Sequence, residues 1–502
     1  MDFEKRKDEK ILFENNIISY IDDLNETKLS LRSKNISKLL ATKRRNKLEQ
    51  TTSSLDFINK ELQFQINKFS SSYNKIISYL TSSDDNLRSY ILNQLCTYFK
   101  YNEPDITEQK MIIEGQFLEL LLNLGKYFYK NKNDENLILV IWIFINIQIY
   151  KEGNGDYLKC LYNENFLDFY NDCFIKLNSE EIMNEIIILL YYSAKINIGA
   201  DFKILQSKVF ESIVNYILNE QQDLEFIENV IKLMIVCLNI SENDELGERE
   251  INLIDKCLFI LKNESNINDE KIQKLCYEGL YIMSKIDDKY KFNQKMIKEG
   301  IPKLILKIKN KNILLYSLKT LTNILTVTND DLEKIDLNEI INFYNSILHL
   351  YDDDKIEYII LNGIYNIADS KYINIIKSSI IWSREKIQKY FNKNEKIQLI
   401  FIKIIKYIIK LGDSNSFVFI NDTNILEYLI YLISNTNYNT TLAKKILKLI
   451  DIYLNIYKSY GKDNFEYLVI LNKFKNWINL FSDMNIKKDD ELEFIILQIV
   501  NI

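Results

Sequence analysis

The chain has 502 residues, of which 47% are hydrophobic, and it contains only 2 prolines and 11 glycines. So few turn-forming residues exclude a many-stranded sheet, which needs a tight turn at each hairpin, and the apolar residues recur at helical spacing instead. The formal net charge of -6 disfavours direct binding of nucleic acid, because proteins that bind it carry a broad positive surface. We therefore predict an all-α protein.

A basic segment lies near the amino terminus, at Leu31–Lys47 (LRSKNISKLLATKRRNK). It carries seven basic residues and no acidic one. Such a run is often the charged face of a solvated helix or a disordered tail, and it can also be a nucleic-acid patch or a signal that targets the protein itself. The residues that follow, about 50–70, separate this segment from the repeating pattern, which begins at about residue 72. We therefore place a boundary between residues 1–70 and residues 71–502.

From about residue 72 to 490 the chain repeats one pattern: an apolar helix, a short polar break and a second apolar helix. The clearest copies are residues 84–124, 268–308, 312–348 and 354–390. Equivalent points lie roughly 40–47 residues apart, which is the period of armadillo and HEAT repeats. About ten such units predict a helical-repeat solenoid, in which each unit buries its apolar face against its neighbours.

Glycines in two copies favour armadillo units over HEAT units. The stretches MIIEGQFLELLLNL (111–124) and MIKEGIPKLILKI (296–308) each place a glycine between a short helix and a longer apolar one. We expect this glycine where the second helix of an armadillo unit turns sharply into the third, because glycine tolerates the backbone conformation needed there. The predicted fold is an armadillo-repeat, right-handed superhelical solenoid with a long concave groove for extended peptides.

The cysteines and the apolar stretches indicate the surroundings of the protein. The six cysteines include no CxxC pair, so we expect small hydrophobic residues in a reducing compartment. The stretches ENLILVIWIFINIQIY and KIQLIFIKIIKYIIKL are short or interrupted by lysine, which favours buried helices over membrane spans. The amino-terminal residues MDFEKRKDEK lack the apolar region of a signal peptide. A soluble intracellular protein without membrane insertion is expected.

No pattern in the sequence indicates catalysis. The single histidine, His349, lies at the end of an apolar helix, where it is more often a packing or surface residue than a base. There is no Gly-rich phosphate loop, no HExxH or GxSxG motif and no Cys/His cluster with metal-ligand spacing. We expect no enzymatic activity, no cofactor and no metal.

The chain resembles the importin-α (karyopherin-α) family over nearly its full length. Residues 83–124 are similar to the first repeat of that family, including an acidic turn and a proline in the same break. The stretches VIWIFINIQIYKEG, LCYEGLYIMSKIDD and SLKTLTNILTVTND look like its second, fifth and sixth repeats. The basic segment resembles the importin-β-binding segment, whose pattern starts with Leu-Arg-Lys and ends with Lys-Arg-Arg-Asn.

This resemblance implies a nuclear import adaptor that shuttles between cytoplasm and nucleus. In the family, importin-β wraps the basic segment, and in its absence the Lys-Arg-Arg cluster folds back and autoinhibits the groove as a mock signal. Cargo proteins with Lys/Arg-rich localisation signals and an export receptor are the further partners implied. The residues carried over to this role are Arg32, Lys34, Lys38, Lys43, Arg44 and Arg45.

The resemblance also implies a set of groove residues. Family members place Trp and Asn four residues apart on the third helix of successive repeats, so that lysine stems lie between indoles while the amides hold the peptide backbone. The matching positions here are Trp142, Asn146, Tyr277, Tyr281, Lys319, Asn323, Thr326, Thr328 and Asn366. Other positions depart from the pattern: Ile188 with Tyr192, Leu233 with Cys237, Asn362, and Ile402 with Lys406.

These departures leave a second reading open, an armadillo scaffold that binds a protein partner without conventional localisation signals. A continuous acidic groove would favour the import adaptor, because it selects lysine-rich peptides. The basic segment favours the adaptor as well, because a pure scaffold does not need it.

Overall fold

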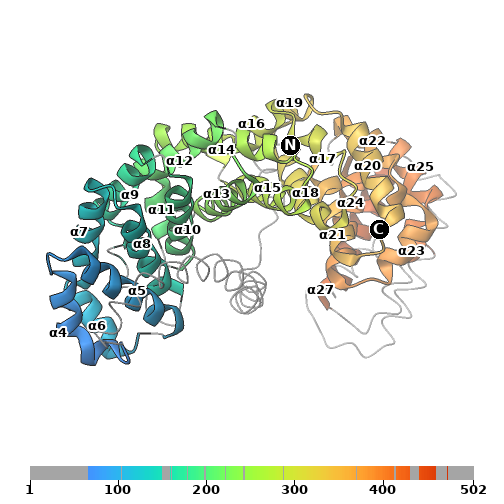
Figure 1. Cartoon of the computed structure of the whole chain (residues 1–502). Coiled ribbons are helices and arrows are strands. Elements are labelled where there is room, and N and C mark those ends of the chain that lie inside the picture. Colours follow the sequence, from blue (N-terminus) through green and yellow to red (C-terminus); the bar gives the residue numbers. More distant parts are fainter. Residues whose placement is uncertain are drawn as a thin grey trace. The chain divides into compact units, whose positions relative to one another are not determined.

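The computed structural model describes residues 66–102, 104–149, 159, 161–177, 179–196, 199–220, 222–240, 244–286, 288–368, 370–411, 414–429, 440–459 and 472. They fall into an amino-terminal part that ends at Tyr290 and a carboxy-terminal part that begins at Lys291, and each part is described by itself. The regular elements of the described residues are all helices, which confirms the predicted all-α class (Figure 1).

The amino-terminal part consists of helices that range from 6 residues in α11 to 17 residues in α5, α10 and α14. Their bounds are α4 Phe69–Leu80, α5 Asp85–Tyr101, α6 Ile106–Glu114, α7 Phe117–Lys130, α8 Asp134–Ile149, α9 Glu164–Lys176, α10 Glu180–Ile196, α11 Ala200–Leu205, α12 Lys208–Asn219, α13 Leu224–Cys237, α14 Glu248–Glu264, α15 Glu270–Met283 and the 3-10 turn η2 Asp288–Tyr290.

The carboxy-terminal part is also built from helices of different lengths, joined by short breaks. Its elements are α16 Phe292–Lys298, α17 Ile301–Ile305, α18 Lys311–Ile324, α19 Asn329–Leu332, α20 Leu337–Leu350, α21 Asp354–Asn366, η3 Ser370–Tyr372, α22 Ile373–Lys377, η4 Ile380–Trp382, α23 Arg384–Phe391, α24 Glu395–Leu411, α25 Ser414–Asp422 and α27 Thr440–Ser459.

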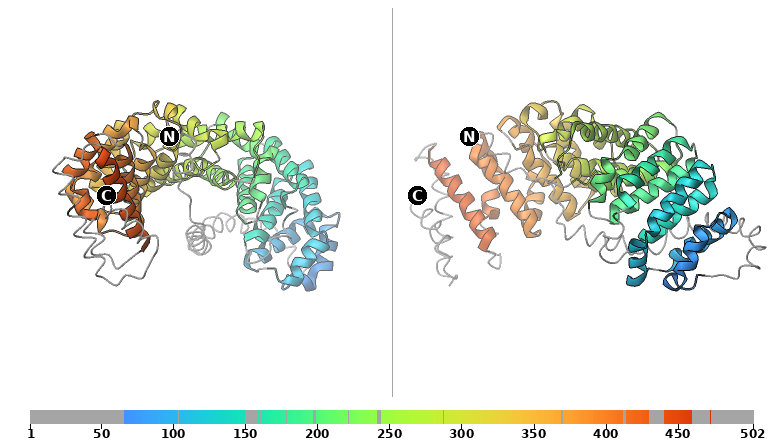
Figure 2. Two further views of the ribbon diagram at one scale, coloured as in Figure 1. Left: turned by 180° about the vertical axis from the view of Figure 1, so that it is seen from behind. Right: turned by 90° about the vertical axis from the view of Figure 1, so that its left-hand side faces the viewer.

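One row of long helices runs through each part, and we call it the inner row. In the amino-terminal part α5, α8, α10, α13 and α15 pack side by side in this order, while α4, α7, α9 and α14 each back one of them (Figure 1). The starts of these inner helices lie 44–49 residues apart. In the carboxy-terminal part α18, α21, α24 and α27 follow one another at spacings of 41–45 residues, and Figure 2 shows α24 and α27 side by side. The repeated unit and its approximate period therefore agree with the sequence pattern.

Most of the long helices begin at a side chain that caps their first turn. Asp84, Asp223, Asp269 and Asp353 accept hydrogen bonds from the free amides at the starts of α5, α13, α15 and α21. Such caps stabilise a helix by about 1 kcal/mol each, because those amides have no partner within the helix. The short polar breaks of the sequence are thus the helix starts.

The two glycines lie between the first and second helices of their units, whereas the sequence pattern predicted them between the second and third. Gly115 separates the short α6 from α7, and α8 follows as the third helix. Gly300 likewise lies between α16 and α17, and its φ of +76° is a conformation that only glycine adopts without strain. Between α6 and α7 it is Gln116 that takes the left-handed conformation. Gly115 instead makes room for Tyr73, whose Oη donates to the carbonyl oxygen of Gly115 at 2.9 Å. A Cβ at residue 115 would lie 2.0 Å from that hydroxyl.

The most apolar stretch forms a helix that is buried on all sides. Every residue of α8 from Asn136 to Gln148 is buried, as expected for a helix without a polar face. In the described ranges no helix is long and apolar enough to cross a membrane. The five cysteines in those ranges, Cys96, Cys173, Cys237, Cys257 and Cys276, are buried thiols, as predicted, whereas Cys160 lies outside them.

Candidate peptide-binding face

Each inner helix packs against the neighbouring inner helices and a helix behind them, and we call its remaining side the inner face. This stripe is partly exposed on α10 and α13 and buried on α8. The sequence placed its peptide-binding residues on these helices. The first of them, Trp142 and Asn146 of α8, lie on this stripe, and each is 5% exposed. Leu139 and Ile138 lie beside them and are also buried, so the α8 stripe is apolar except for the amide of Asn146.

Two of the groove asparagines connect neighbouring inner helices. Asn146 donates from Nδ2 to the carbonyl oxygen of Cys96 on α5 at 3.2 Å, and Cys96 Sγ donates back to the carbonyl of Leu139 at 3.2 Å. The same arrangement recurs in the carboxy-terminal part: Asn366 donates to Thr322 O at 3.0 Å, and Thr322 Oγ1 donates to Ile359 O at 3.2 Å. These amides therefore hold adjacent repeats together.

We expect Asn366→Ala to lower the free energy of unfolding by about 1–2 kcal/mol, since it removes a buried hydrogen bond between repeats. Urea unfolding followed by circular dichroism measures the change. Asn455→Ala is the control, because Asn455 is exposed and bonds only within α27, to Asp451 at 2.9 Å. If both variants are equally stable, the amide of Asn366 has no role in joining α18 to α21.

The fourth-repeat positions inferred by alignment lie on the buried side of α13. Leu233 is fully buried and Cys237 is 1% exposed, whereas Lys232 and Val236 are half-buried on the stripe. Each aligned position thus comes one residue after a position on the stripe. A shift of one residue rotates the side chain by about 100° around the helix axis. In the third repeat Tyr192 is half-buried on the stripe and Ile188 is 7% exposed.

Tyr277 and Tyr281 of α15 are also buried. Tyr277 is 5% exposed, and burial raises its pKa to about 12, with Ser265 at the end of α14 close to its hydroxyl. This side chain therefore points towards α14, the helix that backs α15. Tyr281 is 2% exposed, and the Lys285 ammonium lies 5.8 Å from its ring centroid.

Acidic and amide side chains that the sequence pattern missed lie on the inner face of α10 and α13. Glu181 is exposed, Glu225 is half-buried and Glu185 is 6% exposed. Asn229 Nδ2 donates to Asn184 Oδ1 at 2.9 Å across the two helices. The sequence signal was the spacing Glu181–Glu185, which places both carboxylates on one helix face. These residues do not match the Trp/Asn pattern, and so the pattern could not find them.

Glu228 of α13 is already balanced by lysines. It pairs with Lys232 on its own helix and with Lys271 of α15, whose Nζ lies 2.7 Å from its carboxylate. Burial alone would raise the pKa of Glu228, but the two lysines lower it. The other carboxylates of this face belong to Glu181, Glu185 and Glu225.

The sixth-repeat residues in the carboxy-terminal part lie in mixed surroundings. Lys319 is half-buried with its Nζ 5.8 Å from the Tyr316 ring centroid, and Asn323 is fully buried. Thr326 is 7% exposed and donates to Asn323 O at 2.7 Å, whereas Thr328 is exposed and donates to Asp331 at 3.0 Å. In the seventh repeat Asn362 is fully buried, and in the eighth Lys406 is exposed.

The basic residues Arg32, Lys34, Lys38, Lys43, Arg44 and Arg45 lie outside the described residues. His349 is exposed at the end of α20. Within the described ranges no group of three or more His, Cys, Asp or Glu side chains is placed to hold a metal ion.

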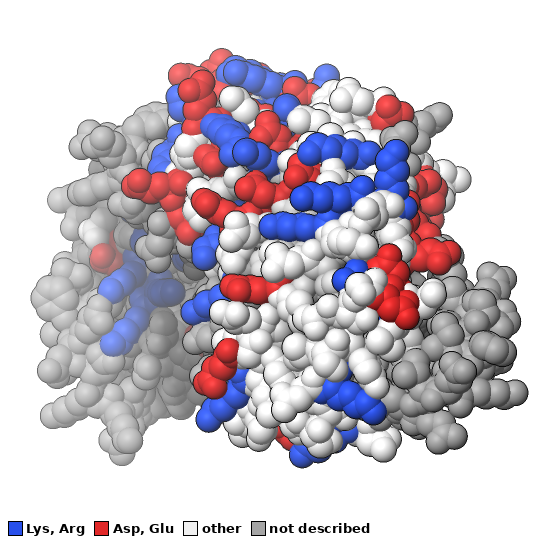
Figure 3. Space-filling view, turned by 60° about the vertical axis from the view of Figure 1, so that its left-hand side comes forward, with Lys and Arg blue, Asp and Glu red and all other residues white. Residues whose placement is uncertain are grey.

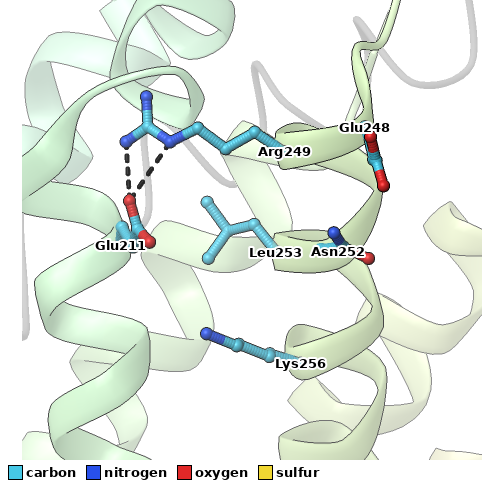
Figure 4. A pocket seen from close by; sticks show the side chains of 6 residues that line it. All are labelled: Glu211, Glu248, Arg249, Asn252, Leu253 and Lys256. Carbon is cyan, nitrogen blue, oxygen red and sulfur yellow. Dashed lines mark hydrogen bonds and ion pairs between the residues drawn. The ribbon is translucent and has the colours of Figure 1, made fainter.

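A cleft of about 620 Å³ lies between α12 and α14, two helices outside the inner row. Arg249 reaches across it from α14 and donates to Glu211 of α12, from Nε at 3.2 Å and from Nη2 at 2.7 Å (Figure 4). Lys256 donates to Asn215 at 2.8 Å. Both cationic side chains of its lining thus bond to residues of α12. The surface drawn in Figure 3 likewise intersperses positive and negative side chains over its upper half.

Comparison with known proteins supports the fold. No family model and no curated protein matches the sequence. The structure is similar to that of an engineered protein, with a TM-score of 0.63 and 14% identity over 85% of this chain and 97% of the other. It is also similar to a structure from a study of the phosphorylation switch that controls the interaction between cadherin and β-catenin, with a TM-score of 0.55 and 12% identity over 88% and 86% of the two chains. The chain is an all-α, armadillo-like helical-repeat solenoid.

Proposed function

We propose that the chain is an adaptor of the importin-α type, which binds an extended Lys/Arg-rich peptide on the inner face of α8, α10 and α13. The observation that supports this proposal most directly is the set of carboxylates at Glu181, Glu185 and Glu225. They lie on adjacent inner helices that the Asn184–Asn229 hydrogen bond joins. A row of acids beside amide groups suits a peptide whose side chains are cationic and whose backbone is extended.

The apolar residues of the same face complement the acids. Tyr192 of α10 is half-buried and offers surface for the aliphatic stem of a lysine side chain, with the buried Trp142 and Ile188 close to the same face. A cation near an aromatic face adds about 0.5–2 kcal/mol. Specificity would then come from the carboxylates, which bind the lysine ammonium groups at the ends of those stems.

The basic amino-terminal segment completes the proposal. Its cluster Lys43, Arg44 and Arg45 would bind importin-β, and in the absence of importin-β it would compete with cargo for the inner face. A tethered segment reaches an effective concentration of about a millimolar, so weak contacts are enough for autoinhibition. The adaptor would move between cytoplasm and nucleus, with an export receptor returning it.

The double variant Glu181→Lys with Glu225→Lys is expected to weaken binding of a lysine-rich localisation peptide at least about tenfold, because two attractive charges become repulsive. Fluorescence anisotropy at two salt concentrations measures the affinity, and the loss should shrink at high salt. The control is Glu114→Lys with Glu119→Lys, two exposed acids of the outer helices α6 and α7.

The same titration on a chain that starts near residue 71 tests autoinhibition, since tighter binding is expected without the basic segment. If the peptide binds neither chain at tens of micromolar, the adaptor proposal fails. Equal losses in the variant and its control would show that only the overall charge matters and would contradict binding at the inner face.

A protein-interaction scaffold without conventional signal binding is the second candidate. The observation that favours it is the burial of Trp142 and Asn146, together with the use of the Asn146 amide between α5 and α8. A peptide would need to reach side chains that are mostly covered. This candidate predicts that the lysine-rich peptide does not bind at all.

A further inference from the structure

A stripe of lysines runs along the inner face of α24, in the carboxy-terminal part. Lys396, Lys406 and Lys410 are exposed on it, and Lys403 is half-buried. Their spacings of seven, three and four residues place all four on one side of the helix. The helix contains a single acidic residue, Glu395, at its first position. The stripe is therefore rich in cationic side chains, in a chain whose net charge is negative.

Neighbouring helices extend the same character. Lys403 lies over the ring of Tyr365 on α21, with its Nζ 5.7 Å from the ring centroid, which places the stripe next to the inner face of α21. On the other side α27 packs against α24 and has exposed lysines at 445 and 448. Tyr407 and Leu399 are half-buried between the lysines and add apolar surface. The result is a basic surface with interspersed aromatic and aliphatic side chains.

We propose that this basic stripe binds an acidic, extended segment of a partner protein, distinct from any lysine-rich peptide on the amino-terminal part. Carboxylates of such a segment would pair with Lys396, Lys406 and Lys410, and its apolar side chains would contact Tyr407 and Leu399. Lysine side chains at this face repel a lysine-rich peptide, so the stripe separates the two kinds of ligand by charge.

A protein segment fits the surface better than a nucleic acid does. Nucleic-acid surfaces carry a broad positive footprint, whereas this stripe is about one helix wide and belongs to a chain of net charge -6. Inner helices of neighbouring repeats lie about 8–10 Å apart, close to the rise of one three-residue turn of a polyproline II segment. Such a segment presents every third side chain on one side, so acids at every third position would reach lysines on α24 and on its neighbour α27.

The test uses the full-length chain and a fluorescein-labelled peptide with glutamate at every third position and leucine or serine between. We expect salt-sensitive binding, and we expect Lys406→Glu with Lys410→Glu to weaken it at least about tenfold. Lys406→Arg with Lys410→Arg should bind like the unmodified chain, because the charge stays. The control is Lys303→Glu with Lys307→Glu, which makes the same charge change at exposed residues in and after α17 and should change the affinity less than about twofold.

Four outcomes would overturn the proposal. They are no binding of the acidic peptide at low salt, equal losses in the α24 and α17 variants, competition by a lysine-rich peptide, and tighter binding of single-stranded oligonucleotide than of the peptide. Glu181→Lys with Glu225→Lys should leave the affinity for the acidic peptide unchanged. Failure of the lysine-rich peptide with success of the acidic one would therefore reject the adaptor function and leave this proposal standing.

Discussion

Replacing Glu357 with alanine is expected to lower the free energy of unfolding by about 3–5 kcal/mol, because it removes a fully buried carboxylate and leaves the buried Lys386 without the acid that it pairs with. Glu357 is fully buried at the start of α21. Two lysines of α23 and one just after it converge on its carboxylate, with Nζ–O distances of 3.6 Å for Lys386, 2.8 Å for Lys389 and 3.4 Å for Lys393. Burial and the neighbouring Lys389 lower the pKa of Lys386, so this group depends strongly on Glu357 for its charge.

Exposed acids complete this network but contribute less to it. Lys389 and Lys393 also pair with Asp352, and their hydrogen bonds lower the pKa of that carboxyl to about 2. Because Asp352 is exposed, solvent screens its pairs, whereas no water reaches Glu357. The largest loss should therefore follow the removal of Glu357.

Urea unfolding, together with hydrogen exchange of the α21 and α23 amides, measures this effect where it arises. Glu333→Ala is the matched control, since Glu333 pairs with one exposed lysine, Lys371, in the same part of the chain. That variant should lose no more than about 1 kcal/mol. If Glu357→Ala and Glu333→Ala are equally stable, the three-lysine network contributes no more than a surface pair.

The variant Phe69→Ala is expected to destabilise the first helices of the solenoid by about 3–5 kcal/mol, the usual loss for a buried phenylalanine. Phe69 begins α4 and is fully buried. Its ring centroid lies 5.1 Å from that of Phe117 on α7, 5.3 Å from that of Phe99 on α5 and 5.5 Å from that of Tyr73. This cluster joins three helices, so its loss should release all of them.

In a repeat protein each unit contacts mainly its neighbours, so the effect should be local. Hydrogen exchange should increase in α4, α5 and α7, while the carboxy-terminal part keeps its protection. Phe259→Ala on α14 is the control, because Phe259 is 47% exposed and its removal should change stability by less than about 0.5 kcal/mol. A uniform loss of protection along the chain would contradict the local role of Phe69.

Much of the fold could be read from the sequence, and the site could be read only in part. Helical spacing, the scarcity of glycine and proline, and the repeat period led to the all-α solenoid, because these features act locally and recur in every unit. The turn at Gly115 was harder to interpret. Its glycine is needed for contact with Tyr73, 42 residues away in the chain, and no local pattern reports such a contact.

The candidate site depended on details that a family pattern does not transmit. Alignment placed Leu233 and Cys237 at groove positions, whereas Lys232 and Val236 lie on the exposed stripe of α13. Asn146 and Asn366 were assigned to a peptide backbone, and the structure shows their amides bonded to the preceding inner helix. The acids of α10 and the lysines of α24 were visible as residues, but their shared faces became clear only once the neighbouring helices were placed.

By itself, the sequence of this protein determined its secondary structure, its repeat and most of its helix starts, since apolar periodicity and capping side chains act within a few residues. Only the tertiary structure decided which stripe of each inner helix is left exposed and which charges meet. A helix turns by about 100° per residue, so its exposed side depends on the helices that cover the other sides. Glu357 of α21 illustrates this, because the lysines that balance it come from α23 and the residues just after it.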